Sequence, residues 1–350
     1  MERVRRRTGD RVPPGGALTG RQLSPDQVRK WARYVETSPL YLHLSEVIAG
    51  DPELMRVLNR IEHTPEPNIL FAGVQFILSR EGGGRLGFHY PNFAGDDAPI
   101  EGVAAPFKEF VLAHEEELCE IGRTRYTQTN ECRRCVALLP AIWITGVERF
   151  HLVDVGTSAG LNLLIDYYHY RWDGVTWGAD SPVELVTENR GAPVTPREVE
   201  ILSRTGLDLH PVDPADEGDR RWLEALIWPE HRDRRERLRA ALEVAQTVDI
   251  ELIVGDAIEL LGPTIQRLPR EEPVVVMHSF VLNQFHPAAR ESLGEILAEC
   301  RTRRVVHQIS MEALDPGDPT AALAVDSGSG LERVARAQPH GEWLELYARP

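Results

Sequence analysis

A short β-rich run that ends in a glycine turn is the feature that most constrains the fold of this chain. His151-Leu152-Val153-Asp154-Val155 is followed by Gly156-Thr157-Ser158-Ala159-Gly160, and a helical pattern over Leu161–Tyr170 comes next. A strand, a tight glycine turn and a helix in direct succession are typical of the first unit of a parallel α/β sheet. We therefore expect repeated β-α-β units from this point of the chain onward.

Strand and helix patterns alternate after this turn. Further strands are expected at Val183–Val186, Glu200–Leu207, Glu251–Val254, Pro273–Met277 and Arg304–Ile309, and helices at Asp219–Trp228, Arg232–Thr247, Ala257–Gln266 and Ala288–Arg301. This alternation predicts a doubly wound parallel sheet with right-handed crossovers. Leu331–Ala335 and Trp343–Ala348, separated by a turn, predict a closing antiparallel hairpin.

The N-terminal part of the chain has a helical pattern instead. Residues 1–20 are rich in Arg, Gly and Pro and predict a disordered tail. Helices are expected from Ser24-Pro25, where Pro occupies the first helical position, and at Pro39–Ala49, Pro52–Ile61, Ile69–Ser79, Pro106–Leu118 and Arg134–Trp143, with a long loop at Glu81–Ala105. The predicted division is a tail (1–20), a helical domain (21–146) and an α/β domain (147–350).

Composition narrows the class of protein. The chain has 350 residues, 42% hydrophobic and 27% charged, with a net charge of −15. An acidic chain is disfavoured as a general nucleic-acid binder, because phosphate affinity comes mainly from Lys and Arg. No stretch approaches the roughly 20 apolar residues of a membrane-spanning helix, the N-terminal arginines lack the apolar run of a secretory signal, and the four cysteines fit a reducing compartment. We expect a cytoplasmic protein without a membrane partner. Its oligomeric state stays open.

The glycine turn is compatible with three chemistries. In a nucleotide-binding unit, glycines let the backbone pass close to the ligand. Ser158 stands where the strict dinucleotide pattern has glycine, which argues against NAD. The same pentapeptide matches the GxSxG elbow of serine hydrolases, with Ser158 as the nucleophile, Asp256 as the acid and His278 or His307 as the base. The preceding helical region and the lack of an HGGG-like segment count against that elbow. The third interpretation is a purely structural turn.

Two acids follow the glycine turn, each at the end of an expected strand. Asp208 ends the strand before Leu209-His210-Pro211 and can accept hydrogen bonds from both ribose hydroxyls of a nucleotide. Asp256 precedes Ala257, so its carboxylate can accept from an adenine amino group while the next backbone N–H contacts the ring. The alternative for Asp256 is a helix N-cap. Because ligands bind at the carboxyl ends of strands in open α/β sheets, the ordered set of three signals favours an adenosyl ligand.

These segments resemble class I S-adenosylmethionine-dependent methyltransferases. More closely, the chain resembles an uncharacterised microbial family catalogued only as a domain of unknown function. The segments that carry this resemblance are Ser38-Pro39-Leu40-Tyr41, Gln128-Thr129-Asn130-Glu131 with Arg134, Gly156–Asn162, Gly206–Asp213, Trp228-Pro229 and His278-Ser279. The resemblance spans nearly the whole chain after the tail.

The resemblance implies a seven-stranded, Rossmann-like methyltransferase sheet, with the helical domain as a lid. It implies S-adenosylmethionine as the cofactor, bound by Asp154, Gly156, Thr157, Ser158, Gly160, Asp208, Asp256 and Ala257. The acceptor would be a small-molecule or protein nucleophile. One departure is the long separation between Gly156 and Asp208, which leaves Glu184 or Glu188 as alternative ribose ligands. A methyltransferase-like fold that binds a nucleotide without catalysis is a further alternative.

Polar residues before the last helix of the N-terminal half are candidates for substrate binding. Gln128, Asn130 and Glu131 are expected to face the cofactor or substrate, and Arg134 would pair with an anion. Helix capping by Thr129 or Asn130 is an equally good explanation of part of this pattern.

His278 ends the strand Pro273–Met277 and is the candidate general base. The alternative is a hydrogen-bonded structural histidine. Asn283 follows closely and is expected to line the same cleft. Cys132 and Cys135 lack a second pair at zinc spacing and no His pattern suggests ligands, so no metal is expected. The charged run His231–Arg239 is interpreted as a solvated helix face.

Overall fold

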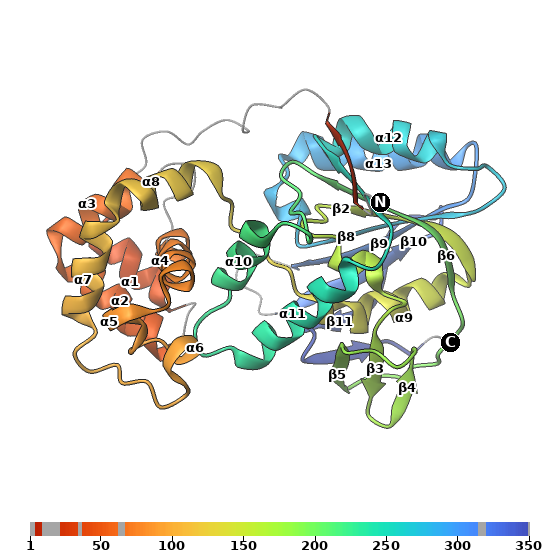
Figure 1. Cartoon of the computed structure of the whole chain (residues 1–350). Coiled ribbons are helices and arrows are strands. Elements are labelled where there is room, and N and C mark those ends of the chain that lie inside the picture. The colour runs from red at the N-terminus through yellow and green to blue at the C-terminus, as the bar shows by residue number, and fades with distance from the viewer. Residues whose placement is uncertain (1–3, 9–21, 34–36, 62–66, 314–319, 349–350) are drawn as a thin grey trace. The chain divides into compact units, whose positions relative to one another are not determined.

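The computed structural model of the chain describes residues 4–8, 22–33, 37–61, 67–313 and 320–348. The chain forms two compact units (Figure 1). The sheet unit contains residues 1–13, 130–215 and 237–350, and the helical unit contains residues 14–129 and 216–236.

The sheet unit is built on one large, mostly parallel sheet. Its strands in the described residues are β1 (Val4–Thr8), β2 (Arg149–Val155), β3 (His169–Trp172), β4 (Val175–Trp177), β5 (Glu184–Asn189), β6 (Glu200–Asp208), β7 (Ile250–Val254), β8 (Val274–Ser279), β9 (Val306–Ala313), β10 (Ala321–Asp326), β11 (Glu332–Ala337) and β12 (Trp343–Leu346). They lie in the order β1-β7-β6-β2-β8-β9-β10-β11-β12-β5-β3-β4. These twelve described strands exceed the seven that the resemblance implies.

The central strands confirm the expected α/β class. β7, β6, β2, β8 and β9 are mutually parallel, and their order along the sheet is that of the first five strands of a doubly wound fold. β10, β11 and β12 then continue as an antiparallel meander. The expected hairpin is therefore present as the β11–β12 pair.

Helices cover both faces of this sheet (Figure 1). α12 (Ala257–Arg267) and α13 (Pro287–Arg301) pack side by side on one face, where Leu261, Ile265 and Leu297 share a buried cluster with strand residues. α9 (Cys135–Thr145) contacts β9, β10 and β5 from the other side. α9 is apolar all around and nearly completely buried, as expected for a helix inside a core.

The expected helix over Leu161–Tyr170 is wrong. A single 3-10 turn, η2 (Leu161–Leu164), follows the glycine turn, and β3 starts at His169. The tyrosine hydroxyls replace part of the helical hydrogen bonding, because Tyr168 donates to the Leu161 carbonyl at 2.7 Å and Tyr170 donates to the Ile165 carbonyl. The apolar residues of this stretch are buried by tertiary packing rather than along one helical stripe.

Four described strands, β1, β3, β4 and β10, are not among the expected ones. Val4–Thr8 lies inside the predicted disordered tail, yet the backbone of β1 pairs in parallel with β7; the rest of residues 1–20 lies outside the described residues. β10 is not among the expected strands, because Ala-Ala-Leu-Ala-Val is poor in the β-branched and aromatic residues that strands favour. Pairing with β9 and β11 on both sides stabilises it instead.

The helical unit has its own apolar core. Its helices are α1 (Pro25–Ala32), α2 (Pro39–Gly50), α3 (Pro52–Arg60), α4 (Pro67–Glu81), α5 (Gly84–Gly87), α6 (Pro91–Ala94), α7 (Ala104–Ala113), α8 (Glu115–Thr124) and α10 (Glu217–Ala225). The predicted start at Ser24 is confirmed: Ser24 and Gln27 form a capping box, with Pro25 in the first turn. α4 is almost fully buried, and its Phe71 stacks on Tyr41 at a centroid distance of 4.2 Å.

The two units divide the chain differently from the predicted boundaries at 146 and 147. η1 (Cys132–Arg134) and α9 belong to the sheet unit, because α9 packs on its strands. Residues 216–236 belong to the helical unit, because α10 packs on α4 and Glu230 accepts hydrogen bonds from Ser38 Oγ (2.6 Å) and Leu40 N (2.9 Å). The division falls within α11 (Arg232–Ala245).

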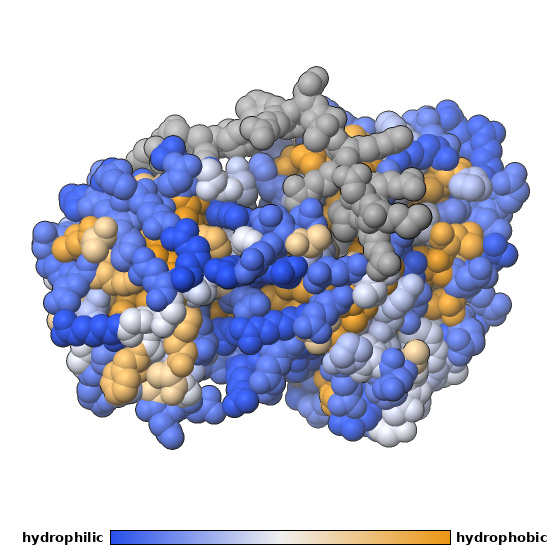
Figure 2. Space-filling view, viewed as in Figure 1, coloured by the Kyte–Doolittle hydropathy of each residue, from blue (hydrophilic) through white to orange (hydrophobic). Residues whose placement is uncertain are grey.

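Hydrophilic residues cover most of the face seen in Figure 2, with separate hydrophobic groups between them. Within the described ranges, no helix has both the length and the apolar character needed to cross a bilayer.

Candidate functional site

The strand order of the sheet unit reverses between β2 and β8. After β2 the chain first forms β3, β4 and β5 at the far end of the sheet; it then adds β6 and β7 on one side of β2, and β8 and β9 on the other. The carboxyl ends of β2, β6, β7 and β8 meet at one edge of the sheet. In doubly wound sheets, ligands bind outside the carboxyl ends at this reversal.

The glycine turn lies at this reversal and has a left-handed backbone at three positions. The φ angles of Gly156, Ser158 and Gly160 are 73°, 51° and 73°. A Cβ on Gly156 would lie 2.5 Å from Val281 Cγ2, so a larger residue does not fit there. Gly156 N donates to the Leu207 carbonyl at 2.8 Å. The turn is therefore fixed between β6 and the segment after β8.

Two carboxylates lie beside the turn: Asp154 is buried and Asp208 is partly buried. Asp154 Oδ2 accepts from the Thr157 hydroxyl at 2.9 Å, and burial raises the pKa of Asp154 to about 7. Asp208 accepts from Ser158 N and His210 N, both at 2.8 Å. Burial raises the pKa of Asp208, and these two hydrogen bonds oppose the shift. Asp208 thus holds the turn with one oxygen and its own following loop with the other.

The alternative ribose ligands lie elsewhere in the sheet. Glu184 and Glu188 belong to β5, which is separated from β2 by β8, β9, β10, β11 and β12. Glu188 pairs with Arg190 on the surface. Asp208 is therefore the acid that the fold brings to the glycine turn.

Asn130 also contacts the glycine turn. Its Nδ2 donates to Ser158 Oγ at 2.9 Å, and its Oδ1 accepts from Ala159 N at 3.2 Å. The side chain therefore braces the turn through both ends of its amide, and the cofactor-facing role expected of Asn130 stays a prediction. Gln128 lies in the helical unit.

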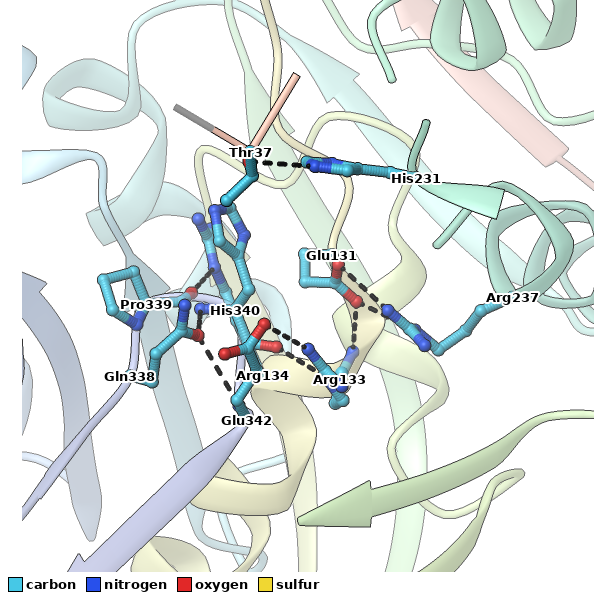
Figure 3. Close-up of polar contacts among 10 residues, drawn as sticks. All are labelled: Thr37, Glu131, Arg133, Arg134, His231, Arg237, Gln338, Pro339, His340 and Glu342. Atoms are coloured by element: carbon cyan, nitrogen blue, oxygen red, sulfur yellow. Dashed lines mark hydrogen bonds and ion pairs between the residues drawn. The ribbon is translucent and has the colours of Figure 1, made fainter. Parts of the chain in front are cut away.

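Glu131 is a buried charge held by arginine (Figure 3). Its carboxylate accepts from Arg237 Nε at 3.0 Å and Arg237 Nη2 at 3.3 Å, and from Arg133 N at 3.1 Å. Its side chain is 1% exposed. The contact with Arg133 N makes Glu131 the N-cap of η1, and not Thr129 or Asn130 as the capping explanation expects. Figure 3 also draws a pair that lies within the helical unit, Thr37 Oγ1 and His231 Nε2, which are 3.0 Å apart.

Arg134 links η1 to two other segments (Figure 3). Its Nε donates to the Pro339 carbonyl at 3.0 Å, in the β11–β12 turn. Its Nη1 donates to Ser279 Oγ at 3.2 Å, and its guanidinium lies 4.5 Å from the centroid of the Phe280 ring. Arg134 therefore reaches the end of β8, on the strand that neighbours the glycine turn.

The charge pattern assigns the run His231–Arg239, to which Arg237 belongs, to a solvated face. This is confirmed for the exposed Arg232, Asp233, Glu236 and Arg239 and is wrong for Arg235 and Arg237. Arg235 is 6% exposed and donates to the carbonyls of Ile227 and Trp228, and Arg237 binds Glu131. A run of alternating charges has no signal that distinguishes a buried arginine from a solvated one. Only the tertiary partners make the difference.

His278 is completely buried between two polar side chains. Its Nδ1 lies 2.8 Å from Glu312 Oε1, and its Nε2 lies 3.0 Å from Gln308 Nε2. The amide nitrogen of Gln308 can only donate, so the imidazole carries its proton on Nδ1 and donates it to Glu312. Both ring nitrogens are occupied, which favours the alternative of a structural histidine.

Asp256 caps α12, with its carboxylate accepting from Ile258 N at 2.8 Å. This geometry fits the capping alternative and still places Asp256 and Ala257 at the carboxyl end of β7. Asn283 lies in η3 (Leu282–Gln284), the short turn after β8. The structure thus gathers Asp154, Asp208, Asn130 and the glycine turn directly.

The cysteines are buried, and burial raises the pKa of the Cys132 thiol to about 12. Across the described ranges, no three His, Cys, Asp or Glu side chains converge as metal ligands would.

No curated protein matches this chain. One family model matches residues 26–346, which is most of the chain. The chain therefore belongs to the family described as "Uncharacterized protein conserved in bacteria (DUF2332)".

Proposed function

We propose that this protein binds S-adenosylmethionine at the glycine turn and transfers its methyl group to a small-molecule or protein nucleophile. The observation that carries the proposal is the position of the turn. It lies at the reversal of a doubly wound sheet, has a left-handed backbone at Gly156 and Gly160, and is flanked by the buried Asp154 and the partly buried Asp208.

The carboxylate oxygens of Asp208 each accept one backbone N–H. A carboxylate has about four acceptor positions, so both oxygens retain capacity for ribose hydroxyls. Asp256 and Ala257 at the end of β7 would meet the adenine ring. Methyl transfer requires mainly alignment and exclusion of water. For that reason the proposal needs no general base and is compatible with the occupied ring of His278.

Calorimetry with S-adenosylmethionine, S-adenosylhomocysteine and NAD tests the proposal. We expect both adenosyl compounds to bind to the wild-type protein and NAD not to bind. Asp256→Ala should weaken adenosyl binding about tenfold, because an adenine contact is lost. Asp216→Ala is the matched control, since Asp216 also caps a helix, α10, through a 2.8 Å bond to Asp219 N.

The two Asp variants separate binding from capping. An aspartate N-cap contributes about 1 kcal/mol to stability, so Asp256→Ala and Asp216→Ala should lower the free energy of unfolding by similar amounts. If Asp256 were only a cap, its variant would match Asp216→Ala in adenosyl affinity as well. If neither adenosyl compound bound to the wild-type protein, the proposed cofactor would be wrong.

A serine hydrolase is the second candidate, favoured by the left-handed backbone of Ser158 (φ 51°), since nucleophile elbows hold serine on a strained turn. Of the nominated histidines, His278 has both ring nitrogens engaged, and His307 Nδ1 lies 2.9 Å from Ser327 Oγ. Labelling by a fluorophosphonate probe that is abolished in Ser158→Ala would establish this candidate. We expect no labelling.

A further inference from the structure

Glu312, on β9, organises the segment that follows β8. Its Oε1 accepts from His278 Nδ1 at 2.8 Å, from Val281 N at 3.2 Å and from Leu282 N at 3.3 Å. Three donors thus converge on one oxygen. The carboxylate is held in place by a side chain and by the backbone of η3.

The second oxygen of this carboxylate has no donors among the described residues. Glu312 Oε2 is buried and has no hydrogen-bond partner in the described structure. Buried polar atoms in native proteins are nearly always satisfied, so an orphaned carboxylate oxygen indicates a partner from outside the chain. A carboxylate accepts hydrogen bonds and attracts positive charge, which makes a cationic nitrogen the best-matched partner.

The backbone beside Glu312 is strained. Phe280 has a φ of 55°, which a bulky residue rarely adopts. Ser279, before it, is fixed through its Oγ by Arg134 Nη1 (3.2 Å) and Asn162 Nδ2 (3.4 Å). Strained residues of this kind persist where the surroundings over-determine them, and they cluster at binding sites.

This segment also contacts the glycine turn. Val281 Cγ2 lies 2.5 Å from the position that a Cβ on Gly156 would take, and Val281 N donates to Glu312. Val281 therefore connects Glu312 to the proposed cofactor loop, on the side of the reversal where β8 lies.

We propose that Glu312 Oε2 binds a cationic nitrogen, an ammonium or a guanidinium, beside the glycine turn. The inference rests on the proposed function, because it assumes that the glycine turn binds the cofactor. The nitrogen belongs either to the methyl acceptor or to the amino-acid end of the cofactor. His278 is then a positioning residue, which holds the carboxylate through Oε1 without touching the ligand. This role accounts for a buried imidazole at the end of β8 with both ring nitrogens occupied.

Glu312→Gln is a sharp test, because glutamine keeps an oxygen for the three donors and replaces Oε2 with an NH2 group. The first arm compares S-adenosylhomocysteine, which carries an ammonium, with 5′-methylthioadenosine, which lacks it. The second arm titrates n-butylammonium and guanidinium chloride, with n-butanol and urea as neutral counterparts. It follows the imidazole nitrogen resonances of His278, assigned by their loss in His278→Asn.

A cofactor ammonium at Glu312 predicts at least a tenfold loss of S-adenosylhomocysteine affinity in Glu312→Gln, with methylthioadenosine unchanged. An acceptor nitrogen predicts unchanged affinity for both adenosyl compounds. The two cations then shift the His278 resonances of the wild-type protein only. His278→Asn has no imidazole resonances, so its cation binding is measured by calorimetry; it should be weaker than in the wild-type protein, with methylthioadenosine affinity unchanged. Glu312→Asp should retain part of the cation binding.

The inference is overturned if Glu312→Gln leaves S-adenosylhomocysteine affinity unchanged and neither cation shifts the wild-type resonances more than its neutral counterpart does. An equal loss for both adenosyl compounds would also overturn it, because such a loss reflects distortion of the whole site. A distinct result is that neither S-adenosylhomocysteine nor methylthioadenosine binds to the wild-type protein, and this result rejects the proposed function.

Discussion

The sheet unit and the helical unit bury polar groups in different ways. In the helical unit, Gln75 Nε2 lies 2.6 Å from Tyr41 Oη and 2.9 Å from the carbonyls of Ala225 and Ile227, so it connects helices to one another. In the sheet unit, the buried acids Asp154 and Glu131 lie in segments that meet the glycine turn or η1.

Backbone strain follows the same division. Among the described residues, the non-glycine positions with positive φ are Ser158, Asp173 and Phe280, all in the sheet unit. Asp173 belongs to the Asp-Gly turn between β3 and β4, where such angles are ordinary. Ser158 and Phe280 instead follow β2 and β8. The comparison indicates that polar burial in the helical unit supports architecture, whereas the sheet edge carries strain and charge that ligand binding would explain.

Arg237→Met should have the largest effect. Removing one partner of a buried ion pair leaves an uncompensated charge, so we expect a loss of about 3–5 kcal/mol in the free energy of unfolding, measured by urea denaturation. The control on the same helix is Arg232→Met, which removes an exposed pair with Glu236 and should cost less than about 1 kcal/mol. Equal losses in the two variants would show that Glu131 does not depend on Arg237.

Asp154→Asn should stabilise the protein in a pH-dependent way. The pKa of Asp154 is raised from 3.8 to about 7 in the folded state, so the folded state binds the proton more tightly than the unfolded chain. The contribution of this proton to the stability of the wild-type protein is complete below pH 4 and is lost as the pH rises through 7. Because asparagine does not titrate, the stability of the variant relative to wild type should rise by about 4 kcal/mol over that range.

Urea denaturation of both proteins at several pH values between 4 and 8 measures this difference in the free energy of unfolding. The contributions of all other titrating groups are the same in both proteins and cancel. Parallel pH profiles would contradict the burial of Asp154 as an acid that prefers to be protonated.

Gln75→Leu tests the helical side of the comparison. The change leaves buried oxygens on Ala225 and Ile227 without this donor, so stability should fall by about 1–3 kcal/mol while adenosyl affinity stays unchanged. Ser79→Ala, in the same helix, removes only a local bond to the Phe76 carbonyl and should cost less. A change in adenosyl affinity with Gln75→Leu would assign the helical unit a part in binding.

Ser24→Ala should have the smallest effect. It removes one half of the capping box of α1, which contributes about 1 kcal/mol, whereas Ser24→Gly should cost only a few tenths. Thermal denaturation of the two variants measures the difference. An equal loss in both would mean that the missing hydroxyl, which neither variant has, accounts for the whole effect and that the backbone preference at this position does not contribute.

The sequence by itself determined the α/β class, the strand that precedes Gly156, most helices and the closing hairpin. These features follow from local chemistry: the periodicity of apolar residues, Pro25 after a capping serine, and glycines in a turn. The position of Asp208 at a strand end and the polar run around Asn130 placed both residues among the candidates, and both contact the glycine turn in the structure.

Only the tertiary structure decided which polar residues are buried and what they touch. The short η2 turn, β1, the reassignment of residues 216–236 and the Glu131–Arg237 pair depend on segments far apart in the chain. Glu312 has no local motif at all, yet it meets His278 and Val281 because β8 and β9 are neighbours. Burial and long-range partners determine the energy of a charged group, and neither is encoded in the spacing of nearby residues.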